Sequence, residues 1–261
     1  MAEHYSGPGT KEEFLKQTDE HKISRIFYHP SPPLKGGHLL GTNTQGADIL
    51  AYLYGGLQVN MKAALFSLPI VYFIGITFGM MMGYFGGMFD LGMQRLIEIF
   101  SQVPFLFIIM IISDMVPLHM KGMFLIISLL IMFGWMSMTY QLRTSTMKEK
   151  ARDYVAAARV PPSRILFVHI LPNLVAILVT LVPFSVSALI LALASLDYLG
   201  FGLPDTYASW GRLLNDGLAD LSASWVVTSA FSALVITLLL VTFIGEAVRE
   251  AFDPKKFTTY K

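Results

Sequence analysis

The polar segment Asp153–Asn173 holds the side chains best suited to a role outside the membrane, because it lies between two long apolar runs. Its first part, Asp153–Arg159, is rich in alanine and predicts a short helix with a cation near its C-terminal end, where the helix dipole favours one. Pro161–Pro162 should end this helix, and Ser163 is expected to cap the next one. Composition alone leaves two interpretations open, a helix lying at the membrane surface or a docking element for a cytoplasmic protein.

Motifs for nucleotide, hydrolytic or metal chemistry are absent from the sequence. It contains no GxxxxGK[ST] loop for ATP, no GxSxG or HExxH motif, and no cysteine. His38, His119 and His169 lie on different segments, so a shared metal site is not expected. We therefore predict no catalytic residues, no metal ligands and no cofactor bound by this chain.

The connection Asp197–Ser224 contains Gly200 and Gly202, which have the spacing of two glycines in a nucleotide-binding fingerprint. No strand precedes them and the third glycine is missing, so that interpretation fails. A re-entrant loop or a tight cap over the helices fits better. Aromatic residues in and beside this connection predict a belt at the membrane–water interface. They are Tyr198, Phe201, Tyr207, Trp210 and Trp225.

Membrane helices must position these segments, because 54% of the 261 residues are hydrophobic and only 14% are charged. Soluble domains carry about 25% charged residues. The apolar runs have the length of about 20 residues that crosses a hydrocarbon core of roughly 30 Å. The net charge of +1 gives no indication of nucleic-acid binding. We predict an all-α, polytopic transmembrane bundle with five spans, which are Lys62–Gly87, Ile97–Val116, Gly122–Leu142, Ile170–Leu196 and Trp225–Gly245.

The distribution of lysine and arginine predicts the orientation of these spans. The loop Arg143–Arg164 and the C-terminal tail are rich in both, whereas Asp197–Ser224 holds only Arg212 against four aspartates. By the positive-inside rule the first two are cytoplasmic and the third is external. An odd number of spans then places the N-terminal segment outside, although it is polar and has no signal-peptide core. A missing upstream span is the favoured explanation, and unaided translocation is the alternative.

Small residues recur every four positions along the first predicted span, at Gly75, Gly79, Gly83 and Gly87. This spacing lets two helix backbones approach closely. Packing within one bundle is the simpler interpretation, and a subunit interface is the alternative. In either case a bulky residue at Gly79 should disrupt assembly. Three prolines also lie inside predicted spans, where neighbouring groups should satisfy the freed carbonyls; they are Pro69, Pro104 and Pro183.

Charged residues near the spans are spaced for pairing along one helix. Arg95 and Glu98 are three residues apart and can pair across a turn. Glu246 lies at the inner end of the last span, and Arg249 follows it three residues later. None of these residues lies deep in the membrane, where a proton-driven carrier usually holds a charge. This weakens the interpretation as a secondary carrier without excluding it.

The polar loop resembles the EAA motif, with which permease subunits of ABC importers dock into their ATPase. Its two halves are YVAAAR at Tyr154–Arg159 and HILPN at His169–Asn173. Other blocks resemble the dipeptide/oligopeptide branch, namely HLLGT at His38–Thr42 with GADIL at Gly46–Leu50, LGFGLP at Leu199–Pro204 with SWG at Ser209–Gly211, and DPK at Asp253–Lys255. Finer features are most similar to the microcin C-type peptide permeases, namely FGWMS at Phe133–Ser137, SLDY at Ser195–Tyr198 and GEAVREAF at Gly245–Phe252. The resemblance covers about residues 38–256.

This resemblance implies a bundle of the binding-protein-dependent ABC importer permease type, in the bacterial plasma (inner) membrane with a cytoplasmic C-terminus. It implies translocation of a peptide or peptide-like solute by alternating access, with no catalysis by this chain. The expected partners are a second permease subunit, two ATPase subunits that bind the ATP, and an external solute-binding protein, with lipid around the spans.

The resemblance also assigns residues and regions. It implies that the residues that couple this chain to the ATPase are Asp153, Tyr154, Ala157, Ala158, Arg159, His169, Leu171 and Pro172. The external loop is marked by Gly200, Gly202, Pro204, Trp210 and Gly211. The expected regions are a polar external segment at 1–61, a permease domain at 62–250 with a cytoplasmic coupling loop at 143–169 and an external loop at 197–224, and a cytoplasmic tail at 251–261.

Two departures from the family pattern leave alternatives open. The family has six spans with a cytoplasmic N-terminus, against five predicted here, and its first span precedes the HLLGT block. The EAA motif also carries Ala-Leu-Gly after Ala-Ala-Arg, whereas Arg159 here runs directly into Val160–Pro162. A loss of about three residues rotates the remainder of the segment by nearly one helical turn. The alternatives are an ATPase-independent secondary carrier or channel, and a truncated, non-functional permease copy.

Overall fold

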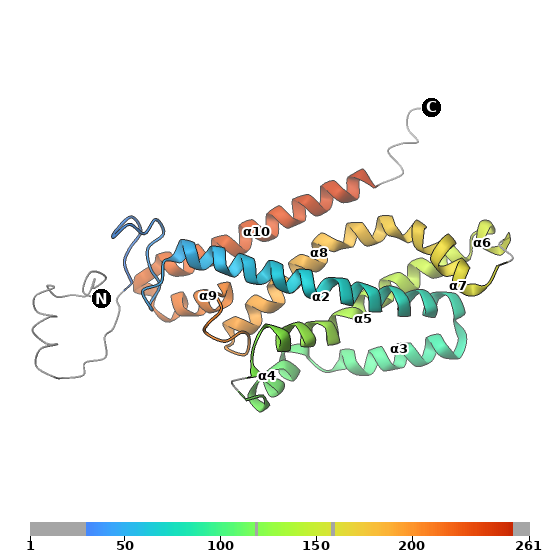
Figure 1. Ribbon diagram of the computed structural model, residues 1–261, viewed down its shortest axis with the longest axis horizontal. Coiled ribbons are helices and arrows are strands. Elements are labelled where there is room, and N and C mark those ends of the chain that lie inside the picture. The colour runs from blue at the N-terminus through green and yellow to red at the C-terminus, as the bar shows by residue number, and fades with distance from the viewer. Residues whose placement is uncertain (1–29, 118–119, 158–159, 253–261) are drawn as a thin grey trace, which may run out of the picture. The chain divides into compact units, whose positions relative to one another are not determined.

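The computed structural model describes residues 30–117, 120–157 and 160–252, which are mostly helical (Figure 1). The described chain divides into two compact units. Unit 1 comprises residues 30–60 and 193–237, and unit 2 comprises residues 61–192 and 238–252. Three long helices each contribute residues to both units, namely α2 at Ile49–Phe85, α8 at Leu171–Tyr198 and α10 at Ser224–Ala251.

Helix α2 extends over Ile49–Phe85 and begins before the span predicted from Lys62. The Asp48 carboxylate caps it by accepting a hydrogen bond from the Ala51 amide at 2.9 Å. The helix ends at Phe85 because Gly86 takes a positive φ of 64°. Its 37 residues span roughly 55 Å, more than a hydrocarbon core of about 30 Å. Part of α2 therefore extends beyond the apolar layer.

Removal of the Asp48 carboxylate in Asp48→Ala should cost about 1 kcal/mol of stability at neutral pH. The hydrogen bond from the Ala51 amide, assisted by the His38 ring 2.6 Å away, lowers the pKa of Asp48 below its usual value. A carboxyl group whose pKa is lower in the folded state stabilises the fold when it is ionised. This contribution is complete above the unfolded-state pKa of 3.8 and is lost as the pH falls through the folded-state pKa. Unfolding midpoints of the two proteins should therefore converge in acid. Asp48→Asn keeps the cap without the charge, and a gap between parent and Asp48→Ala that does not shrink in acid would contradict the assignment.

The second predicted span, Ile97–Val116, is wrong as a single helix. The chain instead forms α3 at Gly87–Gln102 and α4 at Phe105–Met115, bent by 69°. Pro104 has no amide hydrogen and forces the residue before it out of the helical region, and Val103 is extended with ψ of 121°. The proline expected to be tolerated inside a span therefore breaks this one.

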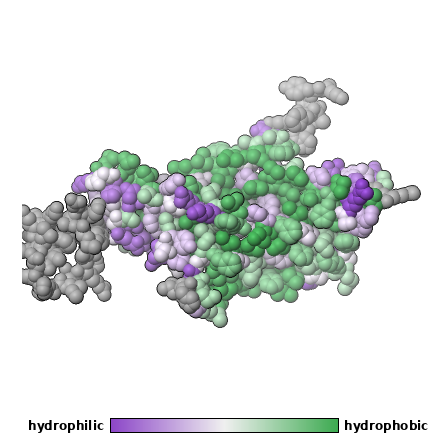
Figure 2. Space-filling model, viewed as in Figure 1, coloured by the Kyte–Doolittle hydropathy of each residue, from purple (hydrophilic) through white to green (hydrophobic). Residues whose placement is uncertain are grey.

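The remaining long helices are α5 at Met123–Lys150, α8 at Leu171–Tyr198 and α10 at Ser224–Ala251. By length and composition, four of the described helical segments can cross a membrane, and the bent pair α3–α4 would be a fifth. Figure 2 shows hydrophobic side chains, in green, over much of unit 2. Hydrophilic ones, in purple, appear near α6 (Asp153–Ala157) and α7 (Pro162–Arg164), and also over unit 1. The polytopic helical membrane protein predicted from the sequence is confirmed.

Three glycines in the later part of α2, Gly75, Gly79 and Gly83, pack against α5 inside unit 2. A Cβ atom at Gly75 would meet Met138 at 2.5 Å, one at Gly79 would meet Leu142 at 2.6 Å, and one at Gly83 would meet the Arg143 carbonyl at 2.5 Å. Packing within one bundle is therefore the interpretation that the structure supports. Gly87 does not belong to this stripe, because α2 has already ended, and a Cβ atom there would meet nothing within 4 Å.

Candidate functional site

The predicted docking segment begins with α6, a short helix at Asp153–Ala157. It follows α5 after a turn in which the Ala151 amide donates to the Met147 carbonyl at 3.3 Å. Asp153 lies in the first turn of α6, where a negative charge suits the helix dipole. Asp153 and Ala157 are exposed, whereas Ala158 and Arg159 lie outside the described residues. The described part of the predicted docking helix thus presents a solvent-facing surface.

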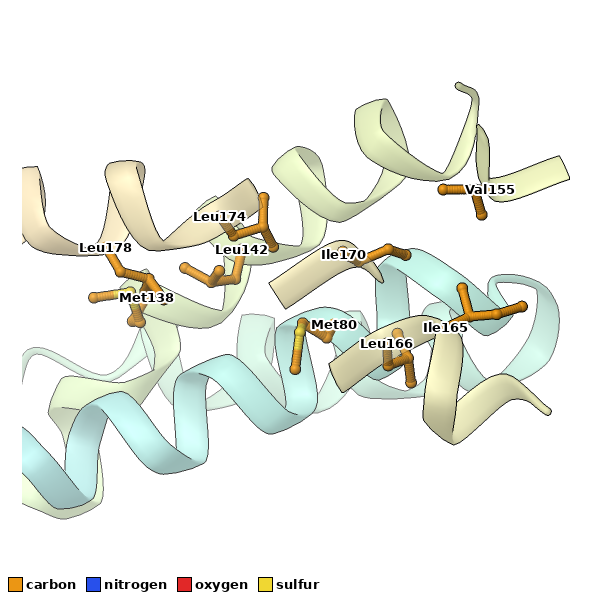
Figure 3. Packing of buried hydrophobic residues seen from close by; sticks show 9 residues of the cluster. All are labelled: Met80, Met138, Leu142, Val155, Ile165, Leu166, Ile170, Leu174 and Leu178. Atoms are coloured by element: carbon orange, nitrogen blue, oxygen red, sulfur yellow. The ribbon is translucent and has the colours of Figure 1, made fainter. Parts of the chain in front are cut away.

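One buried side chain anchors α6 to unit 2. Val155 is only 6% exposed and belongs to a cluster of buried hydrophobic residues drawn from α2, α5, α6, a π-helix at Ile165–Ile170, and α8 (Figure 3). Its members are Met80, Met138, Leu142, Val155, Ile165, Leu166, Ile170, Leu174 and Leu178. Val155 thus places α6 in contact with a close-packed core that several helices share.

Hydrogen bonds of Tyr154 tie α6 to the helices on either side. Its hydroxyl donates to the Glu149 carboxylate at 2.7 Å and accepts from the Asn173 amide at 2.8 Å. Asn173 also donates to the His169 carbonyl at 2.9 Å. Burial, followed by the Glu149 carboxylate, raises the pKa of Tyr154, so the hydroxyl keeps its proton at neutral pH. The sequence marked Tyr154 by resemblance, whereas the link through Asn173 follows only from the structure.

The second half of the docking segment runs through α7 at Pro162–Arg164 and a π-helix at Ile165–Ile170 into α8. The predicted capping role of Ser163 is wrong, because Pro161 occupies the N-cap and no side chain caps the helix. The wider π turn aligns positions five apart, and Ile165 and Ile170 are both buried. Among the residues predicted from the second half of the motif, His169 and Leu171 are half-buried and Pro172 is exposed.

An ion pair between α3 and α5 was not predicted from the sequence. The Arg143 guanidinium donates two hydrogen bonds of 2.5 Å to the Asp90 carboxylate, which also accepts from Gln94 at 3.0 Å. Asp90 is 6% exposed. The sequence placed Arg143 in the predicted cytoplasmic loop. In the structure it lies within α5 and forms the ion pair with Asp90. The signal in the sequence that could have indicated this pair is Asp90 itself, a charged residue in the otherwise apolar start of α3. The predicted pair Arg95–Glu98 is confirmed at 2.6 Å. Glu246 and Arg249 form a second ion pair, at 3.7 Å.

The predicted external loop folds around one buried carboxylate in unit 1. Asp197 accepts hydrogen bonds from the Leu203 amide and the Ser209 hydroxyl, both at 2.6 Å. A Cβ atom at Gly202 would overlap the same carboxylate. From the sequence, Asp197 counted only as an external charge, so its role as the centre of the loop was missed.

Helix α9, at Trp210–Ala219, closes this loop over the core of unit 1. Trp210 is 3% exposed and donates through Nε1 to the Leu53 carbonyl at 2.8 Å. Its predicted place in an interfacial belt is therefore wrong. A Cβ atom at Gly211 would overlap the Ala194 carbonyl, which explains the glycine. Gly200 takes a positive φ of 81°, and the Pro204 carbonyl accepts from Arg212 at 3.4 Å. The loop is compact and packs within unit 1.

The described residues contain no group of three or more histidine, cysteine, aspartate or glutamate side chains that could hold a metal ion. The structure shows a short helix, α6, that is anchored in unit 2 with its outer side facing solvent, and a compact loop around Asp197 in unit 1. Together with the apolar helices, these features define a polytopic helical membrane protein.

Residues 75–258 match the family described as binding-protein-dependent transport system inner membrane component, and the chain belongs to this family. It is 38% identical over 220 residues to the peptidoglycan transport system permease protein YejE of Agrobacterium fabrum, covering 83% of this chain and 57% of that protein. It is 38% identical over 230 residues to the inner membrane ABC transporter permease protein YejE of Escherichia coli, covering 87% of this chain and 66% of that protein.

A third relative is the oligopeptide transport system permease protein OppC of Haemophilus influenzae. Identity is 32% over 229 residues, covering 86% of this chain and 73% of that protein. The chain thus spans less than two thirds of the length of both YejE proteins. The predicted recognition of an ABC permease of the dipeptide/oligopeptide branch, and of a multi-pass inner-membrane protein, is confirmed.

Proposed function

We propose that this chain is the membrane-spanning subunit of an ATP-driven importer that translocates a peptide or peptide-like solute by alternating access. Separate ATPase subunits would bind and hydrolyse the ATP, a second permease subunit would complete the pathway, and an external binding protein would deliver the solute. The names of the relatives, which include peptidoglycan and oligopeptide transport systems, support the class of solute. The distribution of lysine and arginine supports a cytoplasmic C-terminus.

The observation that carries this proposal is the construction of α6. One side of this short helix is held by the buried Val155 and by the Tyr154 hydroxyl, while Asp153 and Ala157 face outward. An ATPase bound to the outward side would push on a helix that is connected to α5 and α8. The movement of the ATPases could then reach the spans through contacts that already exist in unit 2.

Substitution of Ala157 by arginine tests the docking role. The side chain is exposed, so the variant should insert and fold as the parent does, while the added bulk and charge should prevent the ATPase from seating against α6. We expect solute-stimulated ATP hydrolysis by the reconstituted transporter to fall at least tenfold, a loss of about 1.4 kcal/mol in coupling. The measurement is phosphate release with and without solute and binding protein.

Ala247→Arg is the matched control, because Ala247 is an exposed alanine near the C-terminal end of α10. It should leave solute-stimulated hydrolysis close to that of the parent. Normal stimulation in Ala157→Arg would show that α6 is not the coupling element. Uptake that continues without any ATPase would instead favour a secondary carrier.

A further inference from the structure

A cavity of about 560 Å³ lies inside unit 2 and has no role in the docking surface. Its walls come from α2, α5, α8 and the bend between α3 and α4, where Val103, Pro104 and Phe105 face it. The volume is in the range of cavities that bind small molecules. The bend at Pro104, which was not expected from the sequence, therefore shapes one wall of a space between predicted spans.

Most of the cavity wall is apolar and aromatic. Phe100, Phe105, Phe133 and Phe184 contribute rings, and leucine, valine, alanine and methionine side chains fill most of the remainder. None of the described residues that line it is an aspartate, glutamate, lysine, arginine or histidine. A charged group entering this space would lose water without gaining a counter-charge, which is strongly unfavourable.

A few uncharged polar side chains interrupt this apolar wall. Ser185 shares a hydrogen bond of 3.0 Å with the Tyr72 hydroxyl, and the Ser101 hydroxyl lies 3.8 Å from the Met136 sulfur. Ser137 and Gln141, one turn apart on α5, are exposed toward the cavity. Their side chains make no hydrogen bond within the part of the chain that the structure describes, so an amide and a hydroxyl are available to an occupant.

These features together distinguish between three kinds of occupant. A lipid acyl chain has no group that could form a hydrogen bond with the amide of Gln141. The backbone of a partner helix already forms its own internal hydrogen bonds. An extended peptide is different, because its amide and carbonyl groups lose water on entering an apolar space and need new partners. Phenylalanine rings beside hydrogen-bonding side chains suit apolar side chains on such a backbone.

We propose that this cavity is a contact site for an uncharged, apolar segment of the translocated peptide, with Gln141 and Ser137 binding its backbone and the phenylalanine rings receiving its side chains. The inference rests on the proposed import of peptides and adds a preference that this subunit itself imposes. Peptides with lysine side chains should pass less readily than those with leucine side chains, whatever the binding protein prefers.

Gln141→Glu tests the proposal, since it replaces an exposed amide by a carboxylate of nearly the same shape and places a negative charge in the cavity. The complete transporter in proteoliposomes would be supplied with a labelled peptide whose central three residues are leucine (tri-leucine) or lysine (tri-lysine), so that the charged termini lie outside the segment under test. We expect the ratio of tri-leucine to tri-lysine uptake to fall at least tenfold relative to the parent. The same binding protein serves both variants, so its own selectivity cancels. Gln58→Glu makes the same change on an exposed glutamine outside the cavity and should leave the ratio unchanged.

A photoreactive phenylalanine derivative at position 137 provides a second readout that does not depend on the charge variant. Crosslinking to labelled tri-leucine during ATP-driven uptake is expected. Exclusive crosslinking to lipid or to the second permease subunit would overturn the proposal, as would an unchanged uptake ratio in an active Gln141→Glu transporter. Absence of ATP-dependent uptake of either peptide by the parent would refute the proposed function itself, which separates the two failures.

Discussion

An Asp90→Asn variant is expected to be less stable than the parent by about 3 kcal/mol, because it removes one partner of a largely buried ion pair. The Asp90 side chain is 9% exposed and that of Arg143 is 20% exposed, and two hydrogen bonds of 2.5 Å join them. The asparagine would leave the guanidinium with no counter-charge in a region of low dielectric. The measurement is the midpoint of thermal unfolding of the purified protein in detergent, followed by tryptophan fluorescence.

Glu98→Gln is the matched control, because it converts a carboxylate to an amide on the same helix, α3. Its partner Arg95 is 77% exposed and Glu98 is 43% exposed. An exposed pair contributes about 0–1 kcal/mol, so the unfolding midpoint should scarcely move. Equal shifts in the two variants would show that the Asp90–Arg143 pair is no more important than a surface pair.

A Gly79→Leu variant is expected to fold poorly, with a loss of about 3 kcal/mol from overpacking between α2 and α5. A Cβ atom there would meet the Leu142 Cβ at 2.6 Å and the Thr139 carbonyl at 2.7 Å, and leucine adds further atoms beyond Cβ. Neither neighbour can move aside easily, since one is backbone and the other is fully buried. The measurement is the yield of monodisperse protein by size-exclusion chromatography, together with its unfolding midpoint.

Gly92→Leu provides the comparison for this variant. Gly92 is also a glycine inside a helix of unit 2, but a Cβ atom there would meet nothing within 4 Å. Leucine favours helix more than glycine does, so this variant should be as stable as the parent or slightly more so. If Gly79→Leu behaved like Gly92→Leu, the helices α2 and α5 would not pack as closely as described.

Much of the fold follows from local sequence patterns. Runs of apolar residues predicted where the long helices lie. The four-residue spacing of Gly75, Gly79 and Gly83 predicted that α2 packs closely against another helix, which is α5. Alanines followed by prolines predicted a short helix at Asp153, where α6 lies. These patterns succeed because helix formation and membrane burial depend on neighbouring residues and on average hydrophobicity.

The α3–α4 bend shows where such patterns stop being sufficient. Pro104 was recognised in the sequence, but hydropathy alone cannot distinguish a proline that neighbours accommodate from one that breaks a helix. Pro183 lies within an unbroken α8, packed near Gly245, whereas Pro104 ends α3 and starts a bend of 69°. The outcome depends on which neighbours can satisfy the freed carbonyl groups, and that is a tertiary property.

Local patterns in the chain, together with the resemblance of several blocks to a known family, were enough to indicate a polytopic helical permease with a polar segment between two spans. Only the packing of the helices shows which side chains that segment contacts, and which polar groups meet across helices. Asp90 and Arg143 are 53 residues apart, and Tyr72 and Ser185 are 113 apart. Such pairs arise when helices pack, because packing brings distant positions into contact that no local spacing encodes. The cavity beside Gln141 exists for the same reason, since separate elements of unit 2 form its walls.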